Sequence, residues 1–329
     1  MIRKTLLATA LAGLVSSTAY AAPFTLNPGF DGGFTPDGNT VTASLNELGF
    51  TGTYATSIYL GNPAVAGTAV VDTNILSVMT SYGFSAGAHT NILGTSVDNG
   101  NLTPNGEFFA PPIPAGINID ALNAQGGSGD GEGFADGVFT PYGIPTANGT
   151  TWGLTYQYEI KGTTTGSGVD YTSGYFDIFY TNGTTSKQVL RINITNSSLT
   201  IAELVLNGSV SFDFDGVGAV DDTAGDTVIQ NFFNDVPSGK SFYDLWKTNT
   251  TAPVVQFRLD TNVDPAVPDP AQLVCGFSDA LAADCKNPLI RQTSLDGSAT
   301  FSVPEPGSLA LLGLAVTGLG FVGRRRKQA

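Results

Sequence analysis

The sequence predicts an all-β fold: an antiparallel β-sandwich or jelly-roll-like domain with long loops rich in glycine and proline. The composition favours it, because the chain contains 41 Gly and 18 Pro but only 14 Lys and Arg, so long-chain residues that favour helices are scarce. The pattern favours it as well, since apolar and polar residues alternate with the period of two that a strand facing a core requires. With 41% hydrophobic and 13% charged residues, the chain has enough apolar content to fold.

The clearest strand covers residues Trp152–Ile160. The alternation places one set of apolar residues on a single face: Trp152, Leu154, Tyr156, Tyr158 and Ile160. A loop rich in Gly and Thr is expected at Gly162–Gly168, after this strand.

A meander of about five strands is expected between residues 152 and 215. Its later strands are Tyr175–Tyr180, Gln188–Thr195, Leu199–Leu206 and the segment in which Val210, Phe212 and Phe214 alternate with polar residues. Turns are expected at Asn182-Gly183 and Asn207-Gly208, because Asn and Gly both tolerate positive φ. Further strands are expected at Thr40–Leu48, Ala69–Met79, Val254–Asp260 and Ala299–Val303, and a short helix at Ser241–Trp246. This spacing favours a sandwich over a closed sheet, although the sequence leaves closure open.

Residues 22–302 are expected to form one extracytoplasmic β-rich domain, with Pro104–Pro114 and Gly126–Gly133 as surface loops rather than domain boundaries. This segment carries 8 basic and 27 acidic side chains, a formal charge of −19. Such a surface repels phosphate backbones, so a nucleic-acid partner is not expected. The only histidine, His89, excludes sites built from several histidines, and its context indicates a loop residue rather than a catalytic base.

Residues 1–21 have the three parts of a secretory signal peptide in the right order. Arg3 and Lys4 form a basic start, the stretch Leu6–Val15 is apolar, and Ala19 and Ala21 form a small-x-small cleavage site. Cleavage is expected after Ala21, with Ala22 as the alternative. A buried N-terminal helix is the competing interpretation. The signal predicts export by the Sec route.

Residues 303–329 form a second targeting segment. The residues Val303, Pro304, Glu305 and Pro306 precede an apolar run, Leu309–Val322. As a helix this run would rise about 21 Å, less than the roughly 30 Å hydrocarbon core of a bilayer. A basic group follows and is expected to stop transfer and hold that end on the cytoplasmic side: Arg324, Arg325, Arg326 and Lys327. The order predicts transient inner-membrane anchoring followed by removal of the tail.

This tail resembles the PEP-CTERM sorting domain of Gram-negative bacteria. The resemblance implies that an exosortase, a membrane protease-transpeptidase, recognises the Pro-Glu-Pro motif, and that the organism secretes exopolysaccharide. It covers residues 303–329 and says nothing about the fold of residues 22–302. Three inner segments are also similar to the flocculation-associated subgroup of such proteins: Phe242–Trp246, Phe257–Val263 and Leu295–Ser298.

The only two cysteines, Cys275 and Cys285, are expected to form a disulfide, because the signal peptide predicts an oxidising compartment. Closing so short a loop stabilises a fold by roughly 2–3 kcal/mol in the chain-entropy model. A metal site is the alternative, but the chain lacks the further cysteines or histidines that would complete it.

Acidic residues cluster in a glycine-rich stretch at Asp213, Asp215, Asp221 and Asp222. Clustered carboxylates suit Ca²⁺, which takes six to eight oxygen ligands. The spacing matches neither an EF-hand nor a calcium-binding nonapeptide repeat, so a solvated acidic loop is the competing interpretation. No other cofactor is expected.

The sequence predicts an exported, non-enzymatic surface or matrix protein associated with extracellular polysaccharide, biofilm or floc formation. A carbohydrate-binding module is the first alternative and would require exposed aromatic platforms. A glycan-active enzyme that uses two carboxylates is the second and would require a facing Asp/Glu pair in a cleft. The expected final location is the cell surface or the extracellular matrix.

Overall fold

The structure is a computed structural model that describes residues 21–27, 41–42, 44–83, 89–90, 96–97, 120–125, 153–181, 186–199, 203–216, 221–248, 254–262, 268, 273–275 and 288–303. Residues 21–301 form one compact unit, and a second unit comprises residues 1–20 and 302–329. The expected signal peptide and the apolar run Leu309–Val322 lie outside the described residues. Within the described part, no helix combines the length and the apolar character needed to span a bilayer.

Strands dominate the described residues. They are β1 (Phe24–Leu26), β2 (Glu47–Tyr59), β3 (Ala69–Thr73), β4 (His89–Thr90), β5 (Ser96–Val97), β6 (Asp120–Gln125), β7 (Gly153–Thr164), β8 (Val169–Thr181), β9 (Ser186–Leu199), β10 (Glu203–Ser211), β11 (Phe233–Asp235), β12 (Lys240–Ser241), β13 (Gln256–Asn262), β14 (Val274–Cys275) and β15 (Leu289–Ser302). Three short helices accompany them: α2 (Leu76–Ser81), α3 (Thr227–Gln230) and α4 (Phe242–Thr248).

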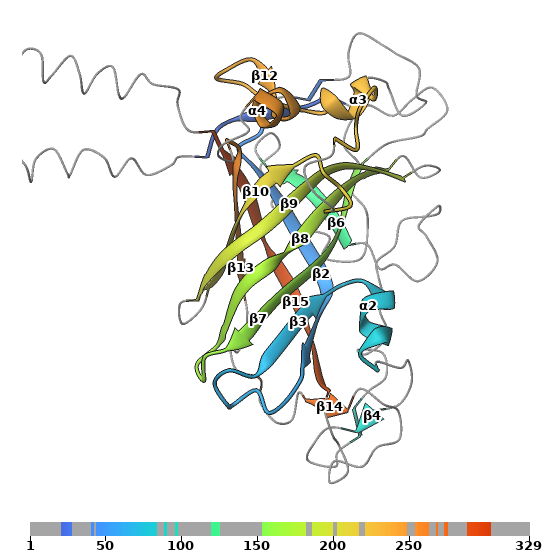
Figure 1. Cartoon of the computed structure of the whole chain (residues 1–329), viewed down its shortest axis with the longest axis vertical. Helices are drawn as coiled ribbons and strands as arrows, with labels where there is room; N and C mark the ends of the chain where they lie inside the picture. The colour runs from blue at the N-terminus through green and yellow to red at the C-terminus, as the bar shows by residue number, and fades with distance from the viewer. Residues whose placement is uncertain are drawn as a thin grey trace, which may run out of the picture. The chain divides into compact units, whose positions relative to one another are not determined.

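Ten strands form one sheet in the order β14-β15-β13-β10-β9-β8-β7-β3-β2-β6 (Figure 1). This sheet closes on itself, because β15 also pairs with β2 and β6 also pairs with β7. Strands on opposite sides therefore face each other across one core, as the layers of a sandwich do. A smaller sheet has the order β1-β11-β12, and β4 pairs with β5. The prediction of an all-β, antiparallel, sandwich-like fold is confirmed. The β15–β2 pairing closes the sheet, whereas the spacing of the strands favoured an open one.

The alternation predicted for the strand at residues 152–160 agrees with the burial along β7. The side chains of Leu154, Tyr156, Tyr158 and Ile160 are all buried, with exposed fractions of 3% or less. The ring of Tyr156 stacks on that of Phe176 in the neighbouring β8, with centroids 4.8 Å apart, and β9 adds buried Leu190 and Ile192. These strands pair as consecutive antiparallel hairpins, as the meander predicts. Trp152 itself lies outside the described residues.

A cluster of phenylalanines, here called the aromatic cluster, fills one end of the core. Its members are Phe24, Phe233, Phe242, Phe257 and Phe301, each 2% exposed or less. Phe301 of β15 lies 5.2 Å from both Phe24 and Phe242, measured between ring centroids. Because edge-to-face and tilted ring pairs are favourable, the cluster binds β1, β11 and α4 to the end of the closed sheet.

Three predictions within the meander are wrong. The expected loop at Gly162–Gly168 is shorter, because β7 continues to Thr164. The expected strand Leu199–Leu206 belongs to two strands, since β9 ends at Leu199 and β10 begins at Glu203. The expected turn at Asn207-Gly208 lies inside β10, at a bulge opposite β9. Four strands therefore replace the expected five.

Close backbone approach explains why glycine occupies Gly208. A Cβ atom there would lie 2.6 Å from the carbonyl oxygen of Asn193, so the position requires glycine for contact between strands rather than for a turn.

Two further strand predictions are also wrong in extent. The segment expected at Thr40–Leu48 contributes only its last residues to β2, which continues to Tyr59. The strand expected at Ala69–Met79 ends at Thr73, where the side chain of Asn74 bonds to the backbone of β7 and the chain leaves the sheet to form α2. Met79 of α2 then packs on Ile58, Val71 and Ile290, which explains its apolar character.

The remaining predictions agree better with the structure. The helix expected at Ser241–Trp246 is α4, the strand expected at Val254–Asp260 is β13, and the strand expected at Ala299–Val303 is the end of the longer β15. The turn expected at Asn182-Gly183 lies outside the described residues.

The close contact between β7 and β8 gives a test of this packing. A Cβ atom on Gly162 would lie 2.2 Å from the carbonyl oxygen of Asp170, so we expect Gly162→Ala to lower the free energy of unfolding by about 2–3 kcal/mol. Gly166→Ala is the matched control, because a Cβ atom there would meet no other atom within 4 Å and only the φ of +86° opposes the change, at a cost of roughly 1 kcal/mol. Urea unfolding of the purified protein measures both. Equal losses for the two variants would contradict the packing.

Candidate functional site

The N-terminal end of the described domain bonds to the last strand, β15, beside the aromatic cluster. The backbone N–H of Ala22 donates a hydrogen bond of 2.8 Å to the carbonyl oxygen of Phe301. Ala22 follows the expected signal cleavage point, and Phe301 stands three residues before Pro304. Ala21 is exposed, Val303 is half-buried, and Ala19 lies outside the described residues.

The N-terminal segment is held by backbone bonds to several other parts of the chain. β1 pairs with β11 in antiparallel register, and Phe24 exchanges two hydrogen bonds with Leu45. The N–H of Val236, just after β11, donates to the carbonyl oxygen of Pro23 at 2.9 Å. Ala22 and Pro23 therefore join the end of β15 to the turn between β11 and β12.

The acidic stretch after β10 brings together three of the four predicted carboxylates. Oxygens of Asp213, Asp215 and Asp222 lie within 4.8 Å of one another. Asp222 accepts hydrogen bonds from the N–H groups of Phe214 and Asp215, and Asp213 accepts one from Gly216. These bonds show that two of the carboxylates shape the turn. The calcium interpretation stays a prediction.

Asp221, the fourth predicted residue, has different partners. Its carboxylate accepts hydrogen bonds from Tyr243 and Lys247 of α4 and from the Thr223 hydroxyl. Partial burial alone would raise the pKa of Asp221, but these donors outweigh it and lower the pKa to about 2. Asp221 therefore fastens α4 to the acidic stretch, with Tyr243 also packed edge-on against Phe212, 5.3 Å away.

A second group of charged residues lies inside the closed sheet. The carboxylate of Asp72 on β3 is fully buried and accepts hydrogen bonds of 2.9–3.0 Å from three hydroxyls, those of Ser57, Tyr158 and Tyr171. Arg291 of β15 is also buried, and its charge acts on Asp72. Burial raises the pKa of Asp72 although the donors and Arg291 oppose that rise. These hydrogen bonds join β2, β3, β7 and β8, so the group stabilises the core of the sheet.

Asp177 and Arg191 form a buried ion pair between β8 and β9. Two hydrogen bonds of 2.7 Å join the guanidinium to the carboxylate, and the guanidinium carbon lies 4.3 Å from the ring centre of Tyr175. Burial raises the pKa of Asp177 against the opposing effect of Arg191. Asp72 and Asp177 are therefore both committed to internal partners, and neither has the accessible carboxylate that glycoside chemistry requires.

The remaining predicted residues are only partly described. Cys275 is disulfide-bonded and buried, and the one other cysteine in the sequence, Cys285, lies outside the described residues. His89 stands in β4 opposite Val97 rather than in a loop, and its side chain is not described. The motif residues Pro304, Glu305 and Pro306 and the basic residues Arg324–Lys327 also lie outside the described part.

Comparison with sequence families decides the nature of the tail. Residues 302–327 match the PEP-CTERM protein-sorting motif. The predicted resemblance of the tail is confirmed, and the likeness to the flocculation-associated subgroup stays a prediction. The PEP-CTERM motif implies export and processing by an exosortase at the membrane before surface or extracellular release. Neither a curated protein nor a solved structure matches the chain.

Sequence patterns missed the contacts that join the N-terminal residues to β11, β12 and the end of β15. β1 has three residues and β12 has two, which is too short for alternation to be recognised. Ala22 and Phe301 stand at opposite ends of the domain sequence, so no local pattern relates them. The only available signal was the run Phe232-Phe233, whose density of aromatic residues indicates a core position.

The Asp221 contacts predict a pH-dependent contribution to stability. Because the folded pKa of Asp221 lies below that of an unfolded aspartate, its contribution is complete above about pH 4 and is lost as the pH falls towards 2. We expect Asp221→Asn to lower the free energy of unfolding by roughly 1 kcal/mol at pH 6, since Lys247 is largely exposed and the pair is screened by solvent.

Urea unfolding at several pH values measures this difference. It should shrink between pH 4 and pH 2, and Tyr243→Phe should show a smaller version of the same profile because it removes one donor. A difference between parent and Asp221→Asn that is constant from pH 6 to pH 2 would rule out the assigned role.

Proposed function

We propose that the protein is a non-enzymatic surface or matrix protein, exported by the Sec route, sorted by an exosortase and associated with exopolysaccharide in biofilm or floc formation. The observation that carries the proposal is the PEP-CTERM match at residues 302–327, directly after the last strand of an all-β domain. A closed sheet, which leaves few free strand edges, suits a protein whose task is to persist outside the cell.

The surface of the described residues favours this role over a carbohydrate-binding module. The exposed large hydrophobic side chains there are Val41, Leu60, Val65 and Val236, and none is aromatic. Saccharide-binding faces use exposed aromatic rings that stack on sugars. The formal charge of −19 over residues 22–302 also fits association with neutral polymers or through cations rather than with anionic chains.

The sorting function predicts the effect of changing the motif. Replacing Pro304, Glu305 and Pro306 by alanine should leave an uncut precursor in the membrane fraction, because two prolines hold the motif extended for recognition. The chain offers a matched control, since Val267-Pro268-Asp269-Pro270 repeats the pattern Val-Pro-acid-Pro inside the domain. Asp269→Ala should be processed like the parent, whereas Glu305→Ala should not. Gel mobility and fractionation in the exosortase-bearing host measure both.

The polysaccharide association has its own test. The mature protein, purified from the host, should be retained on the host's exopolysaccharide while no reducing ends are released. Release of reducing ends would favour the two-carboxylate enzyme. Retention abolished by free oligosaccharide at low concentration would favour a carbohydrate-binding module, and no retention would contradict the association itself.

A further inference from the structure

The sorting motif follows the folded core closely in the sequence. Phe301 is fully buried and contacts the rings of Phe24, Phe233, Phe242 and Phe257. Only Ser302 and Val303 separate it from Pro304. Since an extended chain spans at most 3.3–3.6 Å per residue, the Cα atom of Pro304 lies within about 11 Å of that of Phe301.

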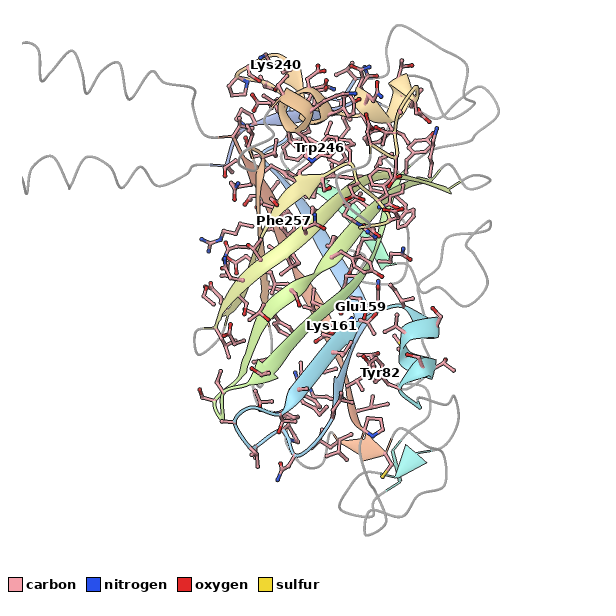
Figure 2. The ribbon with its side chains drawn as sticks, viewed as in Figure 1. Tyr82, Glu159, Lys161, Lys240, Trp246 and Phe257 are labelled. Atoms are coloured by element: carbon pink, nitrogen blue, oxygen red, sulfur yellow. The ribbon has the colours of Figure 1, made fainter. Side chains whose placement is uncertain are left out.

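A continuous set of contacts leads from Phe301 to the exposed surface beside it. The N–H of Ala22 bonds to Phe301, the next residue Pro23 accepts a hydrogen bond from Val236, and Asp235 pairs with Lys240 across β11 and β12. We call the solvent-accessible part of this region the junction surface: the exposed Val236, Pro237 and Lys240, with the half-buried Pro23. Val236 is 46% exposed, and Lys240 is exposed at the same end of the unit as Trp246 (Figure 2).

We propose that the junction surface is the docking surface for the exosortase on the folded domain. The proposal rests on the sorting function proposed above. A protease binds several residues of its substrate as an extended chain, and here only two residues lie between the motif and the core. An enzyme that holds Pro304–Pro306 therefore contacts the junction surface, unless Phe301 first leaves its ring contacts.

The chemistry of the junction surface fits a protein partner. Residues 22–302 carry a charge of −19, but Lys240 is the one charged residue in the segment 236–240, and its side chain is exposed. The surface therefore offers an exposed apolar side chain beside a cation in an otherwise acidic domain. This combination complements an apolar patch with an acidic rim on the enzyme.

Substitutions on the junction surface test the proposal in the full chain. Val236→Ser combined with Lys240→Glu changes two exposed side chains, and we expect tail removal to slow on the order of tenfold, as loss of an interface anchor does. Pulse-chase labelling in the exosortase-bearing host measures the rate, and a non-reducing gel verifies that the disulfide of Cys275 still forms.

The matched control changes the same residue types elsewhere. Val65→Ser combined with Lys161→Glu lies towards the other end of the sheet. Val65 is in the turn after β2, whose last residue, Tyr59, pairs with Leu289 at the start of β15. Phe301 stands twelve positions after Leu289 along β15, a span of about 40 Å. The control variant should be processed at the parent rate.

A ten-residue Gly/Ser linker between Val303 and Pro304 completes the design. It keeps the domain in the chain but lets the enzyme bind the motif without contacting the junction surface. With the linker, the parent should slow to the rate of the double variant, and the two should no longer differ. Parental processing of the double variant would overturn the proposal, and so would faster processing of the linker chain, which would show that the fold merely obstructs the enzyme.

Two further outcomes separate the causes of failure. If the Pro304–Pro306 alanine variant is cut normally, the sorting function itself fails; if it is blocked while the double variant behaves like the parent, only the docking surface fails. A separate experiment tests whether the junction surface binds lipid instead of the enzyme. It measures flotation of the protein with protein-free vesicles of phosphatidylethanolamine and phosphatidylglycerol. Weaker vesicle binding by the double variant, in proportion to its slower processing, would assign the surface to lipid and overturn the proposal.

Discussion

The pairing of β15 with β2 is the constraint on which the rest of the structure depends. It joins Leu289–Ala299 to Leu48–Tyr59 in antiparallel register and turns an open sheet into a closed one. An open sheet would present two long edges, which are templates for aggregation outside the cell. β15 also supplies Phe301 to one end of the core and Arg291 to the other. The same strand therefore closes the sheet and completes both ends of the core.

The two ends of the core are stabilised in different ways. The aromatic end gains from ring packing and apolar burial, and it tolerates no polar group without a partner. The other end contains Asp72, whose desolvation is offset by three hydroxyl donors contributed by β2, β7 and β8. Because the donors come from separate strands, this carboxylate is satisfied only when the strands stand in their final register. The polar end therefore favours one register over its alternatives.

Regular alternation made part of the fold predictable. Along β7 the apolar residues recur at every second position, so its buried face and its pairing with β8 followed from the sequence. Glycine misled the prediction elsewhere. Asn207-Gly208 has the composition of a hairpin turn but lies at a bulge where two backbones nearly touch, and Gly49 and Gly52 interrupt the alternation of β2. Close approach and turn formation both require glycine, and the sequence does not distinguish them.

The candidate site likewise has one part that the sequence predicts and one part that it does not. The sorting motif is linear, so its residues identify it without knowledge of the fold. The contacts of Asp221 with α4 and of Ala22 with Phe301 join residues far apart in the chain, and three-dimensional structure is needed to find them.

The order of the strands along the chain also bears on the timing of folding. β2 is made early and its partner β15 last, so the closed sheet has no stable form until almost the whole domain has been synthesised. Contacts of such long sequence separation form slowly. The closed sheet therefore forms only after β15 has been synthesised, although the hairpins β7–β10 contain only neighbouring strands. Closure of the sheet is in this way coupled to completion of the domain, because the strand that closes it is the last one in the sequence.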